Sequence, residues 1–488
     1  MLLGIDLGTQ SVKAVVCDDA LAVLGQHAVA YPTQYPGPDR AEQDPRAWEA
    51  ALAPAIAVAL AAAGVRGDAI AALAITGQLD GCVAVGAGGE PLHPALIWQD
   101  RRAVGDAARV DARRLFALTG QVADAGHMAP KLAWLRRARP AAARFHQPVS
   151  YLVERLTGEA VIDPALASTT MLLELATGRW ADELLAAFEV TARELPALRP
   201  ACGVAGALSA EGARLTGLPV GVRVAVGTGD DFAAPLGAGV VGPGPVVCVV
   251  GTAEVVGAIA ASPVLDGAAE PMVETHAFPA GGYFVENPGW MSGGAVRWAA
   301  RLLGLASDAE LDALAAAAPP GAAGVTFVPA LAGAMTPVWR PHARGTLHGL
   351  AASHDRSCIA RAVLEGLACA SRDVVTRLGE LGLPAHEVRL LGGGAQSRLW
   401  AQIRADLLGV PHRAAAHHDA TPLGAAMIAA VAAGIAPDLL ALAARISPVG
   451  EMFAPDPAAA GPAAETYARY RRLVDQLAPL ALAPWHTG

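Results

Sequence analysis

The sequence predicts an α/β protein made of two lobes of related design. The chain has 488 residues, which is too long for one hydrophobic core. An apolar strand, a Gly-Thr turn and a second apolar strand occur at residues 2–17, and the same pattern returns at residues 245–260. Glycine and proline crowd residues 237–245, as they do at a domain boundary. We therefore expect one domain over residues 1–240 and a second over residues 245–488.

The elements expected in the first half follow from apolar runs and their punctuation. Short runs separated by glycines and acids predict strands at residues 2–6, 12–17, 24–30, 69–76, 82–85 and 95–98. An alanine-rich run that begins with a proline predicts a helix at residues 45–63. Residues 105–220 are expected to be mostly helical, with Thr-Gly turns at 157–158 and 177–178.

The second half repeats the theme of a strand that ends in a polar turn. Residues 222–226 predict a strand that ends in Gly-Thr-Gly-Asp-Asp, and a helix is expected from Phe232. Residues 246–250 and 388–391 predict two more strands, each followed by a glycine turn. Residues 465–480 have apolar positions at helical spacing and predict a packing helix.

Composition and charge exclude several classes of protein. With 53% hydrophobic and 17% charged residues, the chain can bury sizeable cores. A net charge of −9 argues against a nucleic-acid partner. The six cysteines form no CxxC pair, as expected of a reduced, intracellular protein. The N-terminus lacks the basic start of a signal peptide, and the apolar stretches fall short of a membrane span. We expect a cytoplasmic protein without a membrane partner.

Three glycine turns, each directly after an apolar strand, are candidates for binding phosphate. They are Gly8-Thr9-Gln10-Ser11, Gly251-Thr252 and Gly392-Gly393-Gly394. Glycines let phosphate approach the backbone closely, and small hydroxyls add donors. Lys13 follows the first turn within reach of phosphate, and Asp6 at the strand end could hold Mg²⁺ through water. There is no Walker motif, and the GxGxxG match at residues 237–242 follows a helix, which argues against a Rossmann fold.

These turns belong to a longer set of short motifs that resembles the FGGY family of carbohydrate kinases. The motifs, in chain order, are GIDLGTQSVK, WQDRR, PKLAW, GTGDDFAA, VVGTAE, GTLHGL with ARAVLEG, LLGGGAQSRLW and PLGAA. The resemblance extends from residue 2 to about residue 430, and within the family it is strongest to the xylulose kinases. It implies the two-domain actin/hexokinase-type ATPase fold, built from ribonuclease H-like domains, with a catalytic cleft between the domains. It also implies ATP and Mg²⁺ as cofactors.

The resemblance implies that Asp230 is the catalytic base and, with Asp6, a ligand of Mg²⁺. Phosphoryl transfer needs in-line positioning and a group that takes the hydroxyl proton. Asp230 closes a strand within a glycine turn, where its carboxylate could do this. It could instead cap the helix expected from Phe232, but Asp231 has the better spacing for a cap.

Polar groups and an aromatic side chain after two strands form the candidate sugar site. The residues expected to bind substrate are Gln78, Leu79, Asp80, Trp98, Asp100, Arg101 and Asp231. Leu79 and Asp80 stand where many xylulose kinases have Met-His and glycerol kinases have Arg-Glu. Asp231 stands where the former often have Asn and the latter Gln. Acids at both positions favour hydroxyl groups, which any polyol offers, and do not select a ketose carbonyl. Asp80 could also be a turn former in Leu-Asp-Gly.

The remaining candidate residues concern the nucleotide. The residues expected to bind it are Gly8, Thr9, Gln10, Lys13, Gly251, Thr252, Gly293, Arg297, Gly393, Gly394 and Arg398. The two arginines could equally be surface residues on helices. The adjacent residues His417, His418 and Asp419 lack the i, i+4 spacing of a zinc site and are expected to form a loop.

The motifs together predict an ATP-dependent kinase that converts D-xylulose to D-xylulose 5-phosphate. A second hypothesis is a kinase of the same family for ribulose, glycerol, or a tetritol or pentitol. A third is a nucleotide-switched interaction protein like actin or a chaperone ATPase, which the phosphate turns alone would permit. The partners expected are a small sugar and ATP. The sequence leaves the oligomeric state open, although a homodimer is common in such kinases.

Overall fold

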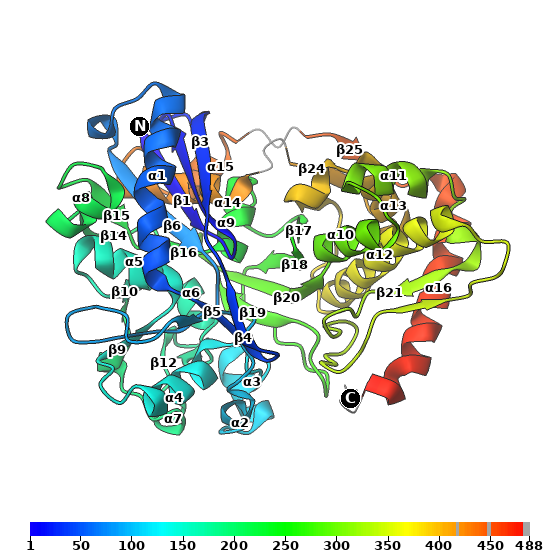
Figure 1. Cartoon of the computed structure of the whole chain (residues 1–488), viewed down its shortest axis with the longest axis horizontal. Helices are drawn as coiled ribbons and strands as arrows, with labels where there is room; N and C mark the ends of the chain where they lie inside the picture. Colours follow the sequence, from blue (N-terminus) through cyan, green and yellow to red (C-terminus); the bar gives the residue numbers. More distant parts are fainter. Residues whose placement is uncertain (416–418, 447–449, 482–488) are drawn as a thin grey trace.

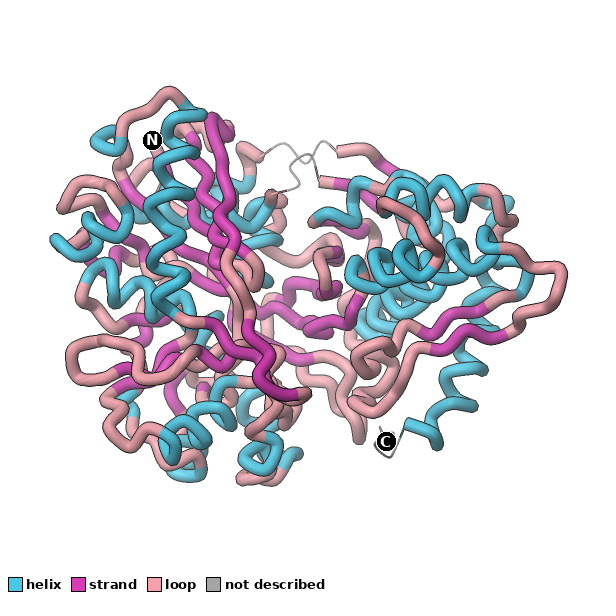
Figure 2. The backbone as a smooth tube through the Cα atoms, viewed as in Figure 1, coloured by secondary structure: helices cyan, strands magenta, loops and turns pink. Residues whose placement is uncertain are grey.

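Two seven-stranded sheets, one in each lobe, organise the computed structural model (Figure 1). The structure describes residues 1–415, 419–446 and 450–481. Figure 2 shows helices packed around the sheet of each lobe, with the two lobes side by side.

The first lobe is formed mainly by the first 240 residues. Its strands are β1 (Leu2–Leu7), β2 (Ser11–Cys17), β3 (Val23–Ala30), β4 (Gln34–Gly37), β5 (Arg40–Gln43), β6 (Ala72–Gly77), β7 (Val83–Val85), β8 (Ala95–Leu96), β9 (Arg144–His146), β10 (Val161–Ile162), β11 (Leu173–Glu174), β12 (Arg179–Trp180), β13 (Ala197–Leu198), β14 (Val204–Ala207), β15 (Arg223–Ala225) and β16 (Thr228–Gly229). Its helices are α1 (Pro45–Ala63), α2 (Val104–Ala107), α3 (Ala112–Thr119), α4 (Met128–Ala138), α5 (Pro148–Thr157), α6 (Pro164–Ser168), α7 (Asp182–Ala187), α8 (Ala210–Thr216) and α9 (Asp230–Gly237).

The later residues form the second lobe and two helices that return to the first. The strands are β17 (Val246–Val250), β18 (Ala253–Ala260), β19 (Glu274–Ala277), β20 (Tyr283–Met291), β21 (Thr326–Val328), β22 (Thr346–His348), β23 (Val388–Leu391), β24 (His412–Ala414) and β25 (Met452–Phe453). The helices are α10 (Gly293–Leu302), α11 (Asp308–Ala316), α12 (Arg356–Glu380), α13 (Arg398–Leu408), α14 (Ala420–Ala432), α15 (Leu439–Ala443) and α16 (Ala460–Leu477).

The repeated hairpin predicted from the sequence is present in both sheets. In the first sheet, β1 pairs antiparallel with β2 and parallel with β6. In the second, β17 pairs antiparallel with β18 and parallel with β23. Each turn is closed by a glycine amide: Gly8 N donates to Ser11 O at 3.0 Å, and Gly251 N donates to Ala253 O at 2.8 Å. Each lobe therefore presents a glycine turn between two antiparallel strands, and the turn of the first lobe is one residue longer.

Several predicted elements are confirmed and others need correction. The strands at 2–6, 12–17, 24–30, 246–250 and 388–391 and the helix at 45–63 are present. The region 105–220 also contains the short strands β9–β14, and the late helix covers 460–477 and not 465–480. The helix expected from Phe232 begins at Asp230, with Gly229 as its N-cap and no side-chain cap. Asp231 is therefore not a cap, because it already lies inside the first turn.

Helix α14 returns from the second half of the chain to the first lobe. It packs against α9, β1 and β6. Glycines allow this contact, because a Cβ on Gly237 would lie 1.8 Å from Ala420 O and one on Gly424 would lie 2.1 Å from Ala233 O. Residues of α14 and α15 accordingly belong to the core of the first sheet. A division at residues 240–245 thus separates the two sheets along the chain but does not separate their cores.

The expectation that every apolar stretch falls short of a membrane span needs correction for helix α1, which is long and apolar enough to cross a membrane by length and composition alone. In the structure it packs on β2 and β3, and Trp48, Leu52 and Ile56 on its inner face are buried. Its apolar residues are those of a helix that covers a sheet.

Candidate active site

Three strand ends meet at one edge of the first sheet. Strands β1 and β16 both run parallel to β6, with Asp6 opposite Thr76 and Gly229 opposite Gly77. The carboxyl ends of parallel strands point the same way, so residues that follow these strands gather at one edge. This register brings the first glycine turn and Asp230 to the same place.

Asp6 is a buried acid with an unsatisfied oxygen. Among the described residues, nothing forms a hydrogen bond with Asp6 Oδ1. Burial and the nearby charges of Asp230 and Asp419 raise the pKa of Asp6 to about 8, although Lys13 opposes this. A buried carboxylate oxygen without a partner, close to a second carboxylate, fits a divalent cation that keeps several of its waters.

Lys13 does not point freely toward the glycine turn. Its ammonium group forms an ion pair with Asp419, which lies at the start of α14. The neighbouring residues His417 and His418, expected to form a loop, lie outside the described residues. Lys13 would have to share this partner, or leave it, to contact a phosphate.

Asp230 and Asp231 occupy the first turn of α9. Negative charge is favoured at this end of a helix by the backbone dipoles. Burial and the charge of Asp80 raise the pKa of Asp230 to about 6, against the lowering effect of backbone hydrogen bonds. Burial and its acidic neighbours raise the pKa of Asp231 well above its usual value. A carboxylate with a pKa near neutrality is suited to accept a proton from a hydroxyl group.

The residues after β6 and β8 have different surroundings. Gln78 donates from Nε2 to Gln43 Oε1 at 2.9 Å, and its buried Oε1 has no partner within the described ranges. Trp98 donates from Nε1 to Thr9 Oγ1 at 2.9 Å and so joins the glycine turn to the candidate sugar site. Leu79 packs closely on Gly229, where a Cβ would lie 2.0 Å from Leu79 Cδ2. Gln78 thus has a free acceptor, whereas Leu79 has a packing role.

Two residues predicted to bind substrate are engaged elsewhere. The carboxylate of Asp100 is fully buried, accepts the backbone amide of Ala41 at 2.8 Å, and is bound by Arg102 at 2.7 Å. Arg101 forms an ion pair with Asp124. The assignment of Asp100 as a substrate ligand therefore needs correction: its lone pairs already hold the segment around Ala41 and Arg102.

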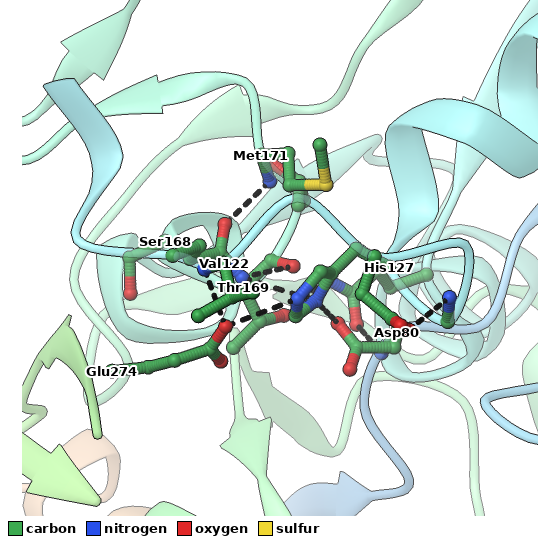
Figure 3. Close-up of polar contacts among 12 residues, drawn as sticks. Asp80, Val122, His127, Ser168, Thr169, Met171 and Glu274 are labelled. Carbon is green, nitrogen blue, oxygen red and sulfur yellow. Dashed lines mark hydrogen bonds and ion pairs between the residues drawn. The ribbon is translucent and has the colours of Figure 1, made fainter. Parts of the chain in front are cut away.

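Asp80 is held in a defined position by three groups (Figure 3). Its φ of 62° is unusual for a residue other than glycine. Its amide donates to Gln147 Oε1 at 2.9 Å, and its carbonyl accepts from Lys131 Nζ at 2.9 Å. Its carboxylate lies 3.2 Å from His127 Nδ1. Asp80 is therefore more than a turn former.

Several residues around Asp80 and the first glycine turn were not predicted from the sequence. They are Tyr31, whose hydroxyl donates to Gly8 O, Lys131 and His127 in the first lobe, and Glu274, His276 and Glu286 on β19 and β20. Glu286 could have been noticed, because it follows the apolar residues 283–285 within β20, whereas Glu274 is the first residue of β19, which reads Glu-Thr-His-Ala. No local signal links them to Asp80.

The second glycine turn contacts the start of α10. Gly293 N donates to Gly251 O at 3.1 Å, and Arg297 Nη2 donates to Thr252 Oγ1 at 2.9 Å. Arg297 thus reaches the second glycine turn. Arg398 differs, because its exposed guanidinium pairs with Glu451, which supports the surface interpretation.

The third turn leaves space beside one glycine. A Cβ on Gly393 would meet no atom within 4 Å, whereas a Cβ on Gly394 would lie 2.3 Å from Val250 Cγ1. The backbone at Gly393 is therefore open to close approach, and Gly394 is needed for packing.

Comparison with known proteins gives one consistent result. Residues 1–237 match the N-terminal domain of the FGGY family of carbohydrate kinases, and residues 246–433 match its C-terminal domain. A xylulose kinase from Escherichia coli is 33% identical over 98% of this chain and 100% of its own. A glycerol kinase from Alkalilimnicola ehrlichii is 35% identical over 89% of this chain and 90% of its own. The crystal structure of a xylulose kinase from Rhodospirillum rubrum has a TM-score of 0.86 and 31% identity, and covers 99% of both chains. The predicted two-domain actin/hexokinase-type ATPase fold is confirmed.

Proposed function

Because the chain belongs to the FGGY family of carbohydrate kinases, we propose that it transfers the γ-phosphoryl group of ATP to D-xylulose, giving D-xylulose 5-phosphate. One observation supports this proposal most directly. Asp230, a carboxylate with a pKa of about 6, follows β16 at the sheet edge where Asp6 and the first glycine turn also lie.

In this reaction Asp230 accepts the proton of the terminal hydroxyl group of the sugar. The hydroxyl oxygen then attacks the γ-phosphorus, and the bridging oxygen leaves with ADP. A positioned base typically contributes about 10²–10⁴-fold to the rate. Asp6 and Asp230 would hold Mg²⁺, which supplies charge neutralisation at the phosphates when bound.

The glycine turns of both lobes would bind the nucleotide. Gly8, Thr9 and Gln10 form the first turn, with Lys13 beside it. The second and third turns would contribute Gly251, Thr252, Gly293, Gly393 and Gly394. Arg297 supports this assignment, because it already donates to Thr252 Oγ1 at 2.9 Å. Arg398 is left out of the proposed set, since Glu451 occupies its guanidinium.

A polyol is the second candidate substrate. It is favoured by the acids at Asp80 and Asp231, which can accept hydrogen bonds from hydroxyl groups but in ionised form offer no donor to a ketose carbonyl. Glycerol kinases are also as similar to this chain as xylulose kinases are. Together with Gln78 and Trp98, these acids would surround the substrate in either case.

The test is coupled ADP release with Mg·ATP and a panel of D-xylulose, D-ribulose, L-ribulose, glycerol, xylitol and erythritol. We expect the highest kcat/KM for D-xylulose. A higher kcat/KM for a polyol would mean that the polyol, and not D-xylulose, is the substrate.

Asp230→Asn should retain sugar and ATP binding and lose about 10²–10⁴-fold in kcat. Asp182→Asn is the matched control, because Asp182 is also the first residue of a helix but is exposed. Undiminished turnover in Asp230→Asn would remove Asp230 from the mechanism. ATP hydrolysis independent of every sugar would favour a nucleotide-switched protein.

A further inference from the structure

A line of polar contacts runs from Asp80 in the first lobe to the sheet of the second (Figure 3). His127 lies in the middle, with Nδ1 3.2 Å from Asp80 Oδ1 and Nε2 3.2 Å from Glu274 Oε1. Glu274 is the first residue of β19, which pairs with β20. The second lobe thus supplies one of the carboxylates that face His127.

His127 is held between these carboxylates away from solvent. Its side chain is 5% exposed, and that of Glu274 is 1% exposed. Burial alone would lower the pKa of His127, but Asp80 and Glu274 raise it to about 10. Nδ1 faces the Asp80 carboxylate and the Gln121 amide nitrogen, each at 3.2 Å, and Nε2 faces Glu274. In the imidazolium form each ring nitrogen can donate to one carboxylate, one in each lobe.

Glu274 is itself fixed in place. Its Oε1 accepts the backbone amide of Val122 at 2.7 Å, and the next residue, Thr275, donates from its amide to Gly120 O at 3.0 Å. These contacts join β19 to the segment that leads to His127. Displacement of Glu274 would therefore be felt at the imidazolium.

At the other end of this line of contacts, the Asp80 carboxylate has one oxygen that is not used in the contact with His127. The backbone of Asp80 is fixed by Gln147 and Lys131, and its Oδ1 faces His127. Across the described ranges, no group donates a hydrogen bond to Asp80 Oδ2, and the side chain of Asp80 is 19% exposed. An exposed oxygen on a side chain so firmly fixed is suited to accept one particular hydroxyl group.

We propose that Glu274 is a positioning residue for substrate recognition, which acts through His127 to orient the Asp80 carboxylate toward a substrate hydroxyl group. The inference rests on the proposed function, because it takes Asp80 as part of the sugar site. It assigns a share of sugar recognition to a strand of the second lobe. Without the negative charge of Glu274, His127 binds Asp80 less firmly and the carboxylate gains rotational freedom.

The variant Glu274→Gln keeps the size of the side chain and an oxygen for the amide of Val122 but removes the charge. We expect the KM for the preferred sugar to rise about tenfold, because roughly one charged hydrogen bond to the sugar is lost. The KM for ATP and kcat should change little. Glu270→Gln is the matched control, since Glu270 lies four residues earlier and pairs at the surface with Arg340. An unchanged sugar KM in Glu274→Gln overturns the proposal.

A double-mutant cycle with Asp80→Asn separates positioning from general damage. If Glu274 acts through Asp80, Glu274→Gln adds little to the sugar KM of the Asp80→Asn protein. Full additivity contradicts the proposal, because it means that Glu274 acts elsewhere. Should Glu274→Gln fail to fold, His127→Asn serves in the same cycle and is expected to raise the sugar KM in the same way; an unchanged KM contradicts the proposal.

An NMR titration of the His127 ring distinguishes failure of this inference from failure of the proposed function. The midpoint should fall in Glu274→Gln and stay in place in Glu270→Gln, whether or not any sugar is phosphorylated. Lack of turnover across the whole panel would reject the kinase proposal while this measurement still stands. An unchanged His127 midpoint in Glu274→Gln would overturn the inference by itself.

Discussion

The β17–β18 hairpin of the second lobe rests on a fully buried ion pair, and removal of the cation of this pair should be strongly destabilising. Arg404 of α13 donates from Nη1 to Glu254 Oε1 at 2.7 Å and from Nη2 to Glu254 Oε2 at 2.6 Å, and neither side chain is exposed. Glu254 also accepts from Ser292 and Ser371 at 2.6 Å. Because Glu254 lies two residues after Thr252, this network supports the second glycine turn from below.

We predict that Arg404→Met lowers the free energy of unfolding of the second lobe by about 3–5 kcal/mol. This is the usual effect of leaving a buried charge without its partner. The two serine hydroxyls keep their hydrogen bonds to Glu254, which places the expected loss nearer the lower value. The second glycine turn should loosen as well, so the KM for ATP should rise more than the KM for the sugar.

Urea unfolding followed by circular dichroism measures this effect, with ATP kinetics on the same samples. The control is Arg398→Met on the same helix, because Arg398 is 75% exposed and pairs with Glu451 at the surface. That variant should lose less than about 1 kcal/mol. Replacing both Glu254 and Arg404 by methionine should be less harmful than Arg404→Met alone, since no buried charge remains. Equal losses in the two single variants, or no relief in the double variant, would refute the reasoning.

Three further predictions concern single sites. Gly393→Ala should raise the KM for ATP roughly tenfold, the effect of one lost hydrogen bond to phosphate, and leave the stability unchanged. Gly394→Ala should instead lower the free energy of unfolding in urea by about 1–3 kcal/mol. A destabilised Gly393→Ala protein with an unchanged KM for ATP would mean that the open space beside Gly393 binds nothing. Asp100→Asn should destabilise the first lobe by about 1.5–3 kcal/mol, because Arg102 loses its charged hydrogen bonds to Asp100 while its pair with Glu42 at 2.7 Å remains. The sugar KM should stay unchanged; a raised sugar KM with normal stability would restore Asp100 as a ligand. The pKa of His127 is raised from 6.5 to about 10, so its stabilising contribution is complete below pH 6.5 and is lost as the pH rises toward 10. The stability difference between the natural protein and His127→Asn should therefore shrink over that range, and a difference independent of pH would contradict the assignment of an imidazolium.

Much of the fold was predictable because its hairpins are encoded locally. The apolar runs at residues 2–17 and 245–260 form paired strands joined by Gly-Thr turns, as predicted. The start of α9 was placed two residues late, because its N-cap is Gly229, which offers no side-chain signal. The return of α14 to the first sheet was not predictable, since it depends on contacts between glycines far apart in the sequence.

The residues of the candidate site could be predicted where they lie at strand ends. They could not be predicted where a contact joins residues of the two lobes. Asp6 is the second-last residue of β1 and Asp230 directly follows β16, and both strands run parallel to β6, so an acid near the end of each strand is a signal that the sequence carries. His127 and Glu274 are 147 residues apart and meet only because β19 packs against the first lobe. Asp100 was assigned as a ligand for the opposite reason: an acid after a strand has the sequence pattern of a ligand, and only geometry shows that Arg102 neutralises it.

The return of α14 has a consequence for how the protein is made. The first sheet can be synthesised and paired once about half of the chain has left the ribosome, but one of its faces stays uncovered until residues 420–443 emerge. During that interval apolar residues of β1 and β6 are exposed to water and to other nascent chains. A fragment that ends at residue 240 should consequently be prone to aggregate, and the maturing chain should depend on chaperones until its last third is complete.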